Sequence, residues 1–329
     1  MKIAINGFGR IGRQVFKILH KRGIFVDYIN DLTDAKTLAH LLKYDTVYGR
    51  FEADISYAQD EIKVDGKSVK VFAESDPSKL PWKDLGVDIV IEATGKFAEY
   101  NKAYKHIEAG AKHVIITAPA KDRADITVVY GLNHNKIDKE KHKIISAASC
   151  TTNAFALMVK VLHENFGIRK GLMTTVHGYT NDQRLQDAPH KDLRRARNAA
   201  LNIVPTSTGA SKTIFEIYPE LKGKLDAIAL RVPVAVPSIV DFSVEIEKDV
   251  SVDDINLAFK KAAEGELKGV LGYTEEELVS SDFIGERRTV IIDLPLTKKV
   301  DNYYKVFGWY DNEWGYSERV ADIVSLLLR

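Results

Sequence analysis

Residues 6–12 are Asn6-Gly7-Phe8-Gly9-Arg10-Ile11-Gly12, a G-x-G-x-x-G pattern between two differently patterned segments. Ile3 to Asn6 before it is apolar and predicts a strand, whereas Arg10 to Lys21 has its apolar residues at helical spacing. In this setting the glycines allow a tight turn, close approach of the backbone to a pyrophosphate, and close packing of helix on strand. A glycine-rich turn without a ligand is the alternative. The pattern favours a dinucleotide site that includes Gly7, Gly9 and Gly12.

A carboxylate at the end of the second predicted strand agrees with this interpretation. Asp31 follows Asn30 about 20 residues beyond the last glycine, where a carboxylate can accept hydrogen bonds from a ribose diol and repel a 2′-phosphate. Asp27 and Asp34 are alternatives, but Asp27 lies within the strand and Asp34 starts the next helix. We therefore expect Asp31 to bind the ribose.

The fold class follows from how strands and helices alternate. Short apolar strands alternate with amphipathic helices over the first half, which is typical of a parallel sheet covered by helices. The predicted strands are Ile3 to Asn6, Phe25 to Asn30, Val87 to Glu92, Val114 to Thr117 and Ile144 to Ser146, with helices at Arg10 to Lys21 and Asp34 to Tyr44. Asp65-Gly66 predicts a hairpin turn between Glu61 to Val64 and Ser68 to Phe72.

The second half has longer strands and predicts a different kind of domain. These strands are Leu172 to Val176, Ala227 to Val232, Ile239 to Ile246, Val290 to Leu294 and Tyr304 to Trp309. We expect an α/β chain with a Rossmann-type doubly wound sheet at residues 1–149. An α+β domain with a mixed, largely antiparallel sheet follows at 150–313. The C-terminal helix, 314–329, should complete the first domain.

Bulk composition excludes several classes of function. The 329 residues include 47 basic and 46 acidic residues, so the net charge of +1 gives no general attraction to nucleic acid or membranes. No apolar run predicts a membrane span, and Met1 leads directly into a strand without an export signal, so we expect a cytoplasmic protein. The single cysteine excludes an intrachain disulfide.

That cysteine, Cys150, is a candidate nucleophile. It lies in Ala148-Ser149-Cys150-Thr151-Thr152-Asn153, directly before a helical pattern. Unpaired N–H groups and the positive end of the helix dipole favour thiolate over thiol at such a position. A lone cysteine can instead be a small buried hydrophobe.

His177 is the candidate base because it ends an apolar strand, where site residues are often presented. An imidazole beside a thiol can stabilise the thiolate and later accept a proton. Most of the nine histidines must be structural, and the sequence does not establish that His177 meets Cys150. No histidine or cysteine spacing indicates a metal site.

Residues 178–204 interrupt the regular pattern and concentrate groups that can bind anions. Gly178 to Arg197 carries many arginines and almost no apolar period, and a long irregular loop within a compact domain is usually functional. Guanidiniums and hydroxyls suited to phosphate come from Thr180, Arg194, Arg195, Arg197, Thr206 to Gly209 and Arg231. Lys191 to Arg197 could instead be the solvated face of a basic helix.

Taken together, these motifs resemble those of phosphorylating glyceraldehyde-3-phosphate dehydrogenase over essentially the whole chain. The matching stretches are residues 5–13, 30–34, 148–153, 190–197 and Trp309-Tyr310-Asp311-Asn312-Glu313. The resemblance implies NAD as cofactor, glyceraldehyde 3-phosphate and inorganic phosphate as substrates, and a homotetramer. It also assigns NAD binding to residues 1–149, and catalysis and oligomerisation to residues 150–313. It also implies that the arginine-rich loop reaches toward a neighbouring subunit.

The resemblance further implies residue roles. Cys150 would be the nucleophile and His177 the base, while Thr180 and Arg231 would hold the substrate phosphate. The attacking phosphate would be bound by Ser149, Thr151, Arg195, Thr208 and Gly209. Contacts to NAD would come from Gly7, Gly9, Arg10, Ile11, Gly12, Asp31, Thr117, Asn312 and Tyr316.

Some positions depart from the family pattern. Ser75 stands where many relatives carry an arginine near the adenine, Thr117 replaces a usual serine, and Ala154 replaces a frequent second cysteine. Erythrose-4-phosphate dehydrogenase shares the Cys/His pair, but the run Tyr179-Thr180-Asn181-Asp182 favours the triose enzyme. A nucleotide- or RNA-binding protein without dehydrogenase activity is a third possibility.

Overall fold

The computed structural model describes residues 1–329 and divides the chain into two compact units. The first unit comprises Met1–Val128, Asn133–Ala148 and Ser317–Arg329, and the second comprises Val129–Leu132 and Ser149–Tyr316. This division differs in detail from the predicted domains. Ser149, residues 129–132 and residues 314–316 all belong to the second unit.

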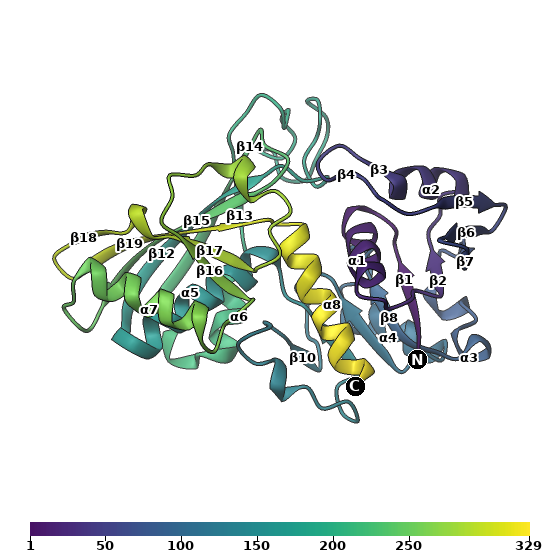
Figure 1. The fold of residues 1–329 in the computed structure, drawn as a ribbon, viewed down its shortest axis with the longest axis horizontal. Helices are drawn as coiled ribbons and strands as arrows, with labels where there is room; N and C mark the ends of the chain where they lie inside the picture. Colours follow the sequence, from purple (N-terminus) through teal and green to yellow (C-terminus); the bar gives the residue numbers. More distant parts are fainter. The chain divides into compact units, whose positions relative to one another are not determined.

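The first unit is built on a nine-stranded sheet of order β10-β11-β9-β8-β1-β2-β7-β6-β5 (Figure 1). All neighbours from β10 to β7 pair in parallel, and only β6 and β5 are antiparallel. The strands are β1 (Lys2–Asn6), β2 (Tyr28–Asn30), β5 (Ile55–Ala58), β6 (Glu61–Val64), β7 (Lys67–Phe72), β8 (Val87–Glu92), β9 (His113–Ile116), β10 (Ile126–Thr127) and β11 (Ile144–Ser146). The strand order reverses at β1, which is where ligands bind in open sheets of this kind.

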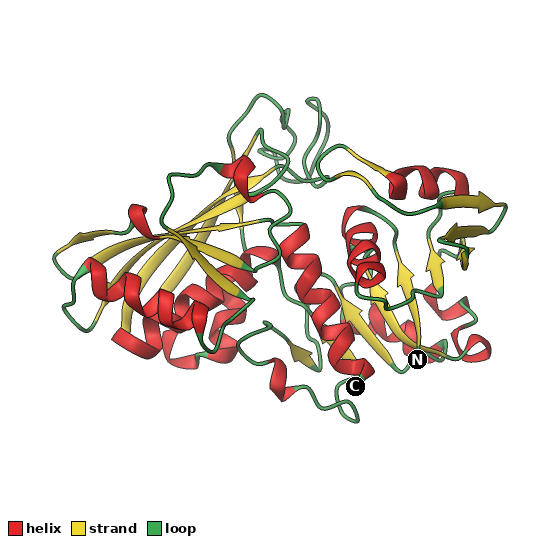
Figure 2. Ribbon diagram, in the orientation of Figure 1, coloured by secondary structure: helices red, strands yellow, loops and turns green.

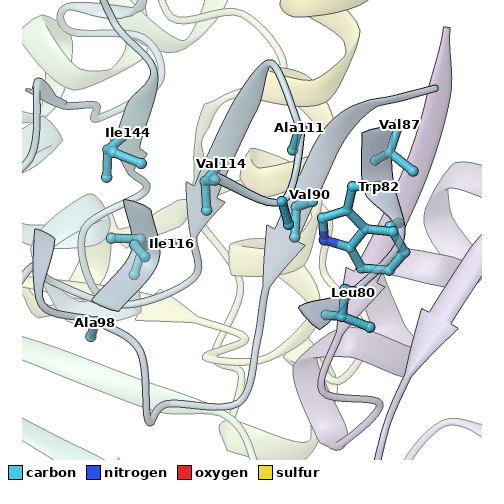
Figure 3. Close-up of a cluster of buried hydrophobic side chains, with 12 residues drawn as sticks. Leu80, Trp82, Val87, Val90, Ala98, Ala111, Val114, Ile116 and Ile144 are labelled. Atoms are coloured by element: carbon cyan, nitrogen blue, oxygen red, sulfur yellow. The ribbon is translucent and has the colours of Figure 1, made fainter. Parts of the chain in front are cut away.

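Helices cover this sheet because its parallel strands are apolar on both sides. All six residues of β8 are buried, as expected for a strand covered on both faces. Figure 3 shows one of the buried clusters, whose members include Trp82, Val90, Val114 and Ile116. The helices are α1 (Arg10–Lys21), α2 (Ala35–Lys43), α3 (Trp82–Leu85) and α4 (Tyr100–Glu108), and β3 (Tyr44–Asp45) pairs with β4 (Gly49–Arg50) as a separate ribbon.

The predicted hairpin and C-terminal helix are both present. Asp65 and Gly66 have φ angles of 50° and 77°, the left-handed values that a tight turn between β6 and β7 requires. The C-terminal helix is α8 (Trp314–Leu328), and its residues from Ser317 onward join the first unit. There Arg22 pairs with Glu318 and, at 2.8 Å, with Asp322. One strand is shorter than predicted, since β2 begins at Tyr28 rather than Phe25.

The second unit is an eight-stranded mixed sheet, so the predicted fold class is confirmed for both halves. Its order is β13-β14-β12-β15-β19-β17-β16, with β18 paired to β19. The pairs β12–β14 and β16–β17 are parallel, and the others are antiparallel. The strands are β12 (Ile168–Gly178), β13 (Val204–Ser207), β14 (Leu225–Val232), β15 (Ser238–Ile246), β16 (Leu271–Thr274), β17 (Val290–Asp293), β18 (Lys298–Val300) and β19 (Tyr303–Tyr310).

Helices pack on one side of this sheet, as Figure 2 shows. They are α5 (Cys150–Phe166), α6 (Ala210–Ile217) and α7 (Val252–Glu264), and α5 contacts β12, β15 and β19 as well as both other helices. Residues 151–162 of α5 are all buried, so this helix forms the core of the unit. Short 3-10 turns lie at Pro77–Lys79, His134–Lys136, Pro219–Leu221, Ser280–Phe283 and Leu294–Leu296.

Candidate active site

Cys150 is the first residue of α5, as the helical pattern after it predicts. Ser149 is the N-cap, and its hydroxyl accepts a hydrogen bond from the backbone N–H of Thr152 at 2.9 Å. Ala148, immediately before it, has a φ of 54°, a left-handed value that is uncommon for a residue with a side chain. The thiol is partly exposed at the positive end of the helix.

The structure brings His177 to this thiol. Nε2 of His177 lies 3.5 Å from Sγ of Cys150, although 27 residues separate them in the sequence. The imidazole is 4% exposed on β12, one residue before that strand ends. Cys150 is therefore paired with a possible proton acceptor, which a cysteine that only fills space does not need.

Arg231 completes the group because β14 runs parallel to β12 in a register that places it opposite His177. Its guanidinium contacts Nδ1 of His177 and lies 3.3 Å from the carbonyl oxygen of Gly178. Nδ1 of His177 also lies 2.7 Å from that carbonyl oxygen, to which it can donate only when protonated. The guanidinium can only donate, so it competes with the carbonyl oxygen for Nδ1; in the tautomer that carries its proton on Nδ1, Nε2 faces the thiol as an acceptor.

Burial disfavours the charged form of both members of the pair, and the Arg231 charge opposes this effect at Cys150 but adds to it at His177. Desolvation raises the pKa of Cys150, whereas the Arg231 charge and hydrogen bonds from Thr151 lower it. Desolvation, reinforced by Arg231, lowers the pKa of His177 to about 3. Each isolated ion is disfavoured, so transfer of the proton from sulfur to Nε2 must create both charges together.

Tyr310 supports the site and was missed in the sequence analysis. Its fully buried hydroxyl lies 2.8 Å from the Thr151 hydroxyl and 2.7 Å from the Thr175 hydroxyl, and its ring meets His177 edge to face at 6.0 Å. Burial raises the pKa of Tyr310, so it stays protonated and can donate. Its place within the matched stretch after Trp309 was the available signal.

The other predicted phosphate ligands lie on separate elements of the second unit. Thr180 lies two residues after the end of β12, and Thr208 and Gly209 precede α6, with Gly209 as its N-cap. Arg195 pairs with Asp182, and burial together with the nearby Arg195 charge lowers the pKa of Arg231. We therefore expect phosphate to bind beside Arg231, because an anion there would offset the repulsion between the guanidiniums of Arg231 and Arg195.

The loop between β12 and β13 contains neither helix nor strand, so the basic-helix alternative for Lys191 to Arg197 is wrong. It is held instead by pairs such as Asp187–Arg197 at 2.9 Å and by bonds between its own backbone groups. Exposed apolar side chains project from it: Leu185, Leu193, Leu201 and Ile203.

The glycine turn of the first unit has the shape that a dinucleotide requires. A Cβ on Gly7 would meet the backbone N of Thr94 at 2.7 Å, and one on Gly12 would meet the carbonyl oxygen of Gly7 at 2.2 Å. Gly9 has no such neighbour within 4 Å, and α1 starts at Arg10 and Ile11 without a side-chain cap. The turn thus combines close packing with open space beside a helix start, which fits a pyrophosphate.

Asp31 lies where expected, but its carboxylate also has a structural role. It accepts hydrogen bonds from the backbone N–H of Phe8 at 2.8 Å and of Thr33 at 3.0 Å. Oxygen lone pairs remain for a ribose diol. Thr117, which follows β9, donates its hydroxyl to the carbonyl oxygen of Glu92 at 3.1 Å.

The remaining predicted cofactor residues belong to the second unit. Asn312 accepts a hydrogen bond through Oδ1 from Ser238 at 2.9 Å, and Ser238 in turn accepts one from the backbone N–H of Gly178. Tyr316 is buried, and desolvation together with the negative charge of the Cys150 thiolate raises its pKa. These contacts link Asn312 and Tyr316 to the surroundings of the Cys/His pair.

The chain has neither a candidate metal cluster nor a helix suited to spanning a membrane. No group of three or more histidine, cysteine, aspartate or glutamate side chains has a geometry that could hold a metal ion. None of the helices combines the length and apolar character needed to cross a bilayer.

Comparison with known proteins gives one consistent result. The family model "Glyceraldehyde 3-phosphate dehydrogenase, NAD binding domain" matches residues 1–100, and the corresponding C-terminal domain matches residues 149–312. Glyceraldehyde-3-phosphate dehydrogenase of Thermotoga maritima is 57% identical over 332 residues, covering 100% of this chain and 99% of the relative. Glyceraldehyde-3-phosphate dehydrogenase 1 of Bacillus cereus is 56% identical, with 99% and 98% covered, and the Geobacillus stearothermophilus enzyme is 55% identical with the same coverage.

Proposed function

Since the chain belongs to the glyceraldehyde-3-phosphate dehydrogenase family, we propose that it converts glyceraldehyde 3-phosphate and inorganic phosphate to 1,3-bisphosphoglycerate through a covalent thioester on Cys150. It is an NAD-dependent oxidoreductase of that type, acting in glycolysis and gluconeogenesis. The observation that carries the residue assignment is the 3.5 Å contact between Sγ of Cys150 and Nε2 of His177.

The covalent steps follow from this contact. The thiol proton passes to Nε2 of His177 as sulfur attacks the aldehyde carbon, which forms a thiohemiacetal. The Cys150 N–H and protonated His177 stabilise the developing oxyanion, and His177 then gives its proton to that oxygen to form the thiohemiacetal hydroxyl. Bound NAD supplies a hydride acceptor for the oxidation. His177 accepts the hydroxyl proton as the thiohemiacetal becomes a thioester.

Phosphate completes the reaction. An oxygen of inorganic phosphate attacks the thioester carbonyl, the sulfur leaves as thiolate, and an acyl phosphate is released. Arg231 and Thr180 bind the phosphate of the substrate, while Ser149, Thr151, Arg195, Thr208 and Gly209 bind the attacking phosphate. The covalent route conserves oxidation energy that hydrolysis would lose.

The first unit binds NAD through the glycine turn. Gly7, Gly9 and Gly12 let the pyrophosphate approach α1 at Arg10 and Ile11, and Asp31 binds the adenosine ribose. Thr117, Asn312 and Tyr316 are the other contacts that we assign to NAD. The fit rests on the open space at Gly9 and on the uncapped start of α1.

A homotetramer in the cytoplasm is the proposed working form. Exposed apolar side chains collect on the uncovered face of the second unit's sheet, at Leu172 and Ile228, and on the long loop, at Leu193 and Leu201. Large apolar side chains exposed on a sheet face and on a neighbouring loop are typical of a surface that meets another subunit. The free thiol of Cys150 needs a reducing compartment.

An absorbance assay of NADH formation tests the function. With glyceraldehyde 3-phosphate, NAD and phosphate, continuous turnover is expected, and without phosphate it should stop after a single burst. Erythrose 4-phosphate in place of the triose should react more slowly. Faster reaction with the four-carbon aldehyde would assign the chain to the related dehydrogenase, and no NADH from either would contradict the proposal.

A further inference from the structure

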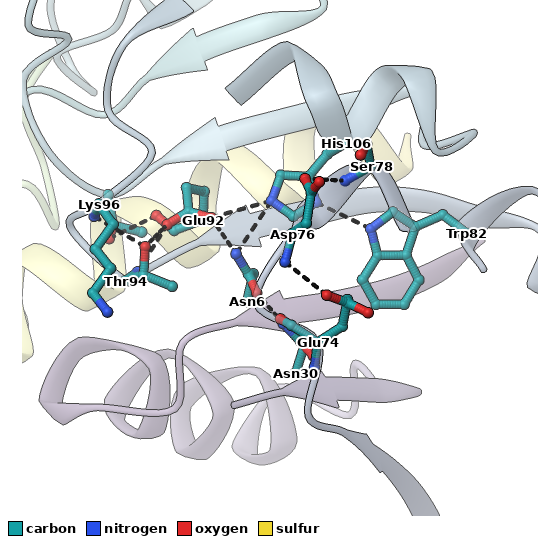
Figure 4. Close-up of polar contacts among 11 residues, drawn as sticks. Asn6, Asn30, Glu74, Asp76, Ser78, Trp82, Glu92, Thr94, Lys96 and His106 are labelled. Carbon is teal, nitrogen blue, oxygen red and sulfur yellow. Dashed lines mark hydrogen bonds and ion pairs between the residues drawn. The ribbon is translucent and has the colours of Figure 1, made fainter. Parts of the chain in front are cut away.

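A connected group of buried polar side chains crosses the first unit's sheet at the carboxyl ends of its parallel strands (Figure 4). Its members are at most 4% exposed and come from different elements: Asn6 of β1, Asn30 of β2, Glu92 of β8, Trp82 of α3 and His106 of α4. We call it the Glu92 network. None of these side chains takes part in the chemistry assigned to Cys150.

Glu92 is the anionic centre of this network. Its Oε2 accepts hydrogen bonds from Nδ2 of Asn6 at 2.5 Å and from Nε2 of His106 at 3.1 Å. Its Oε1 accepts from the hydroxyl of Thr94 at 2.5 Å and from the backbone N–H of Thr94 at 2.9 Å. Burying a carboxylate is costly unless it is well hydrogen-bonded, and an apolar residue would suit a purely structural position better.

Trp82 fixes the orientation of the imidazole. An indole N–H can only donate, and Nε1 of Trp82 lies 3.1 Å from Nδ1 of His106. Nδ1 must therefore accept, so the ring proton is on Nε2 and points to Glu92. The α3 and α4 segments thereby hold the carboxylate in one direction.

The other end of the network reaches the loops that surround the nucleotide site. Oδ1 of Asn6 accepts from Nδ2 of Asn30 at 2.7 Å. The Asn30 amide also accepts from the backbone N–H of Glu74 and donates to its carbonyl oxygen, each at 2.9 Å. The segment beginning at Glu74 follows β7 and includes Ser75, which is expected near the adenine. The two hydrogen bonds between Asn30 and Glu74 therefore fix the backbone beside that expected adenine position.

The glycine turn is part of the same assembly. Asn6 immediately precedes Gly7, whose missing Cβ makes room for the backbone of Thr94. The Glu92 carbonyl oxygen accepts from both the N–H and the hydroxyl of Thr117, at 3.0 and 3.1 Å. Side chain and backbone of Glu92 thus connect the segments that follow β1, β8 and β9.

We propose that Glu92 is a positioning residue for NAD, which holds the loops after β1, β2, β7 and β8 in their binding arrangement before the cofactor arrives. This inference rests on the proposed NAD site. Loops fixed in advance lose less conformational entropy on binding, so the network raises affinity without touching the ligand. The positioning acts on the adenosine half, because Asp31, Glu74 and the glycine turn lie at that edge.

Glu92→Gln tests the proposal with little change in volume. Its amide N–H₂ cannot accept from the donors that surround Glu92, so we expect the dissociation constants of NAD and of ADP-ribose, measured by calorimetry, to rise at least about tenfold. The alkylation rate of Cys150 by iodoacetamide without cofactor should stay within about twofold of the parent rate, since all assigned groups around that thiol belong to the second unit.

Asp88→Asn is the matched control. Asp88 lies on the same strand, is also buried, and accepts from the backbone N–H of Lys2 at 2.7 Å, but it is near the amino end of β8. This variant should lose stability while its affinity for ADP-ribose changes less than about threefold. Equal affinity losses in Glu92→Gln and Asp88→Asn would overturn the positioning role.

A second pair of variants keeps the test valid if Glu92→Gln does not fold. Thr94→Val removes one donor to Glu92 from a partly exposed loop position, and Thr94→Ser retains that hydroxyl. Weaker ADP-ribose binding by the valine variant, restored by serine, supports the proposal. Parent-like binding by Thr94→Val would refute it while leaving the proposed function intact, whereas failure of the parent to bind NAD would refute both.

Discussion

Arg231→Gln separates recognition of the substrate phosphate from the chemistry of the Cys/His pair. A hydrogen bond to a charged group contributes about 1.5–3 kcal/mol, so losing one such bond to the phosphate should lower kcat/KM for glyceraldehyde 3-phosphate roughly 10- to 150-fold. Unphosphorylated glyceraldehyde has no group for that bond and should lose less than about tenfold. Arg231→Lys retains the positive charge without the guanidinium fork, so its kcat/KM for glyceraldehyde 3-phosphate should lie between those of the parent and of Arg231→Gln.

The contact between Arg231 and His177 adds a pH effect to this prediction. The guanidinium lowers the pKa of both Cys150 and His177, so its removal raises both. The pH profile of glyceraldehyde oxidation should therefore move to higher pH in Arg231→Gln, and the two substrates are best compared at the optimum of each variant. Equal losses for both aldehydes at those optima would mean that Arg231 acts structurally and not through the phosphate.

Three other substitutions test separate parts of the account. In His177→Asn the Cys150 thiol loses its proton acceptor, so the pKa of the thiol should rise and its alkylation at pH 7 should slow. An unchanged pH profile of alkylation would contradict the proposed proton transfer between Cys150 and His177. The parent should prefer NAD over NADP by roughly tenfold or more in kcat/KM. Asp31→Ala should reduce that ratio, even though loss of the hydrogen bond to Phe8 weakens the binding of both cofactors. An unchanged ratio would show that Asp31 does not set the choice of cofactor. Burial lowers the pKa of Lys17 to about 8, so the folded protein binds fewer protons than the unfolded chain between that pH and 10.5. Lys17→Met should accordingly raise the free energy of unfolding by on the order of 2 kcal/mol below pH 8 and by almost nothing above pH 10.5, and a gain independent of pH would exclude this cause.

Local sequence patterns predicted the parts of the fold that depend on neighbours in the chain. The glycine turn, the Asp65-Gly66 hairpin and the start of α5 at Cys150 are fixed by spacing and turn chemistry, and the structure places them as expected. Cys150 and His177 were chosen for their positions at a helix start and a strand end. Their contact depends on how β12 packs against α5, which no local pattern specifies.

Features that depend on tertiary packing were missed for the same reason. Tyr310 meets Thr151 and Thr175 only because β19 and β12 lie close to the start of α5. Arg231 was expected to contact only phosphate, but the parallel register of β14 and β12 also sets it against His177. The Glu92 network joins the ends of three strands and two helices, and its residues have no common sequence spacing.

Mass spectrometry of the enzyme mixed with NAD and glyceraldehyde 3-phosphate, without inorganic phosphate, tests the central claim most directly. We predict a burst of about one NADH per chain and an acyl group on the peptide that carries Cys150, released when phosphate is added. Cys150→Ser should give neither and should lose at least roughly three orders of magnitude in turnover, while it still binds NAD. An acyl group on another residue, or sustained NADH formation with an unmodified Cys150, would contradict the account.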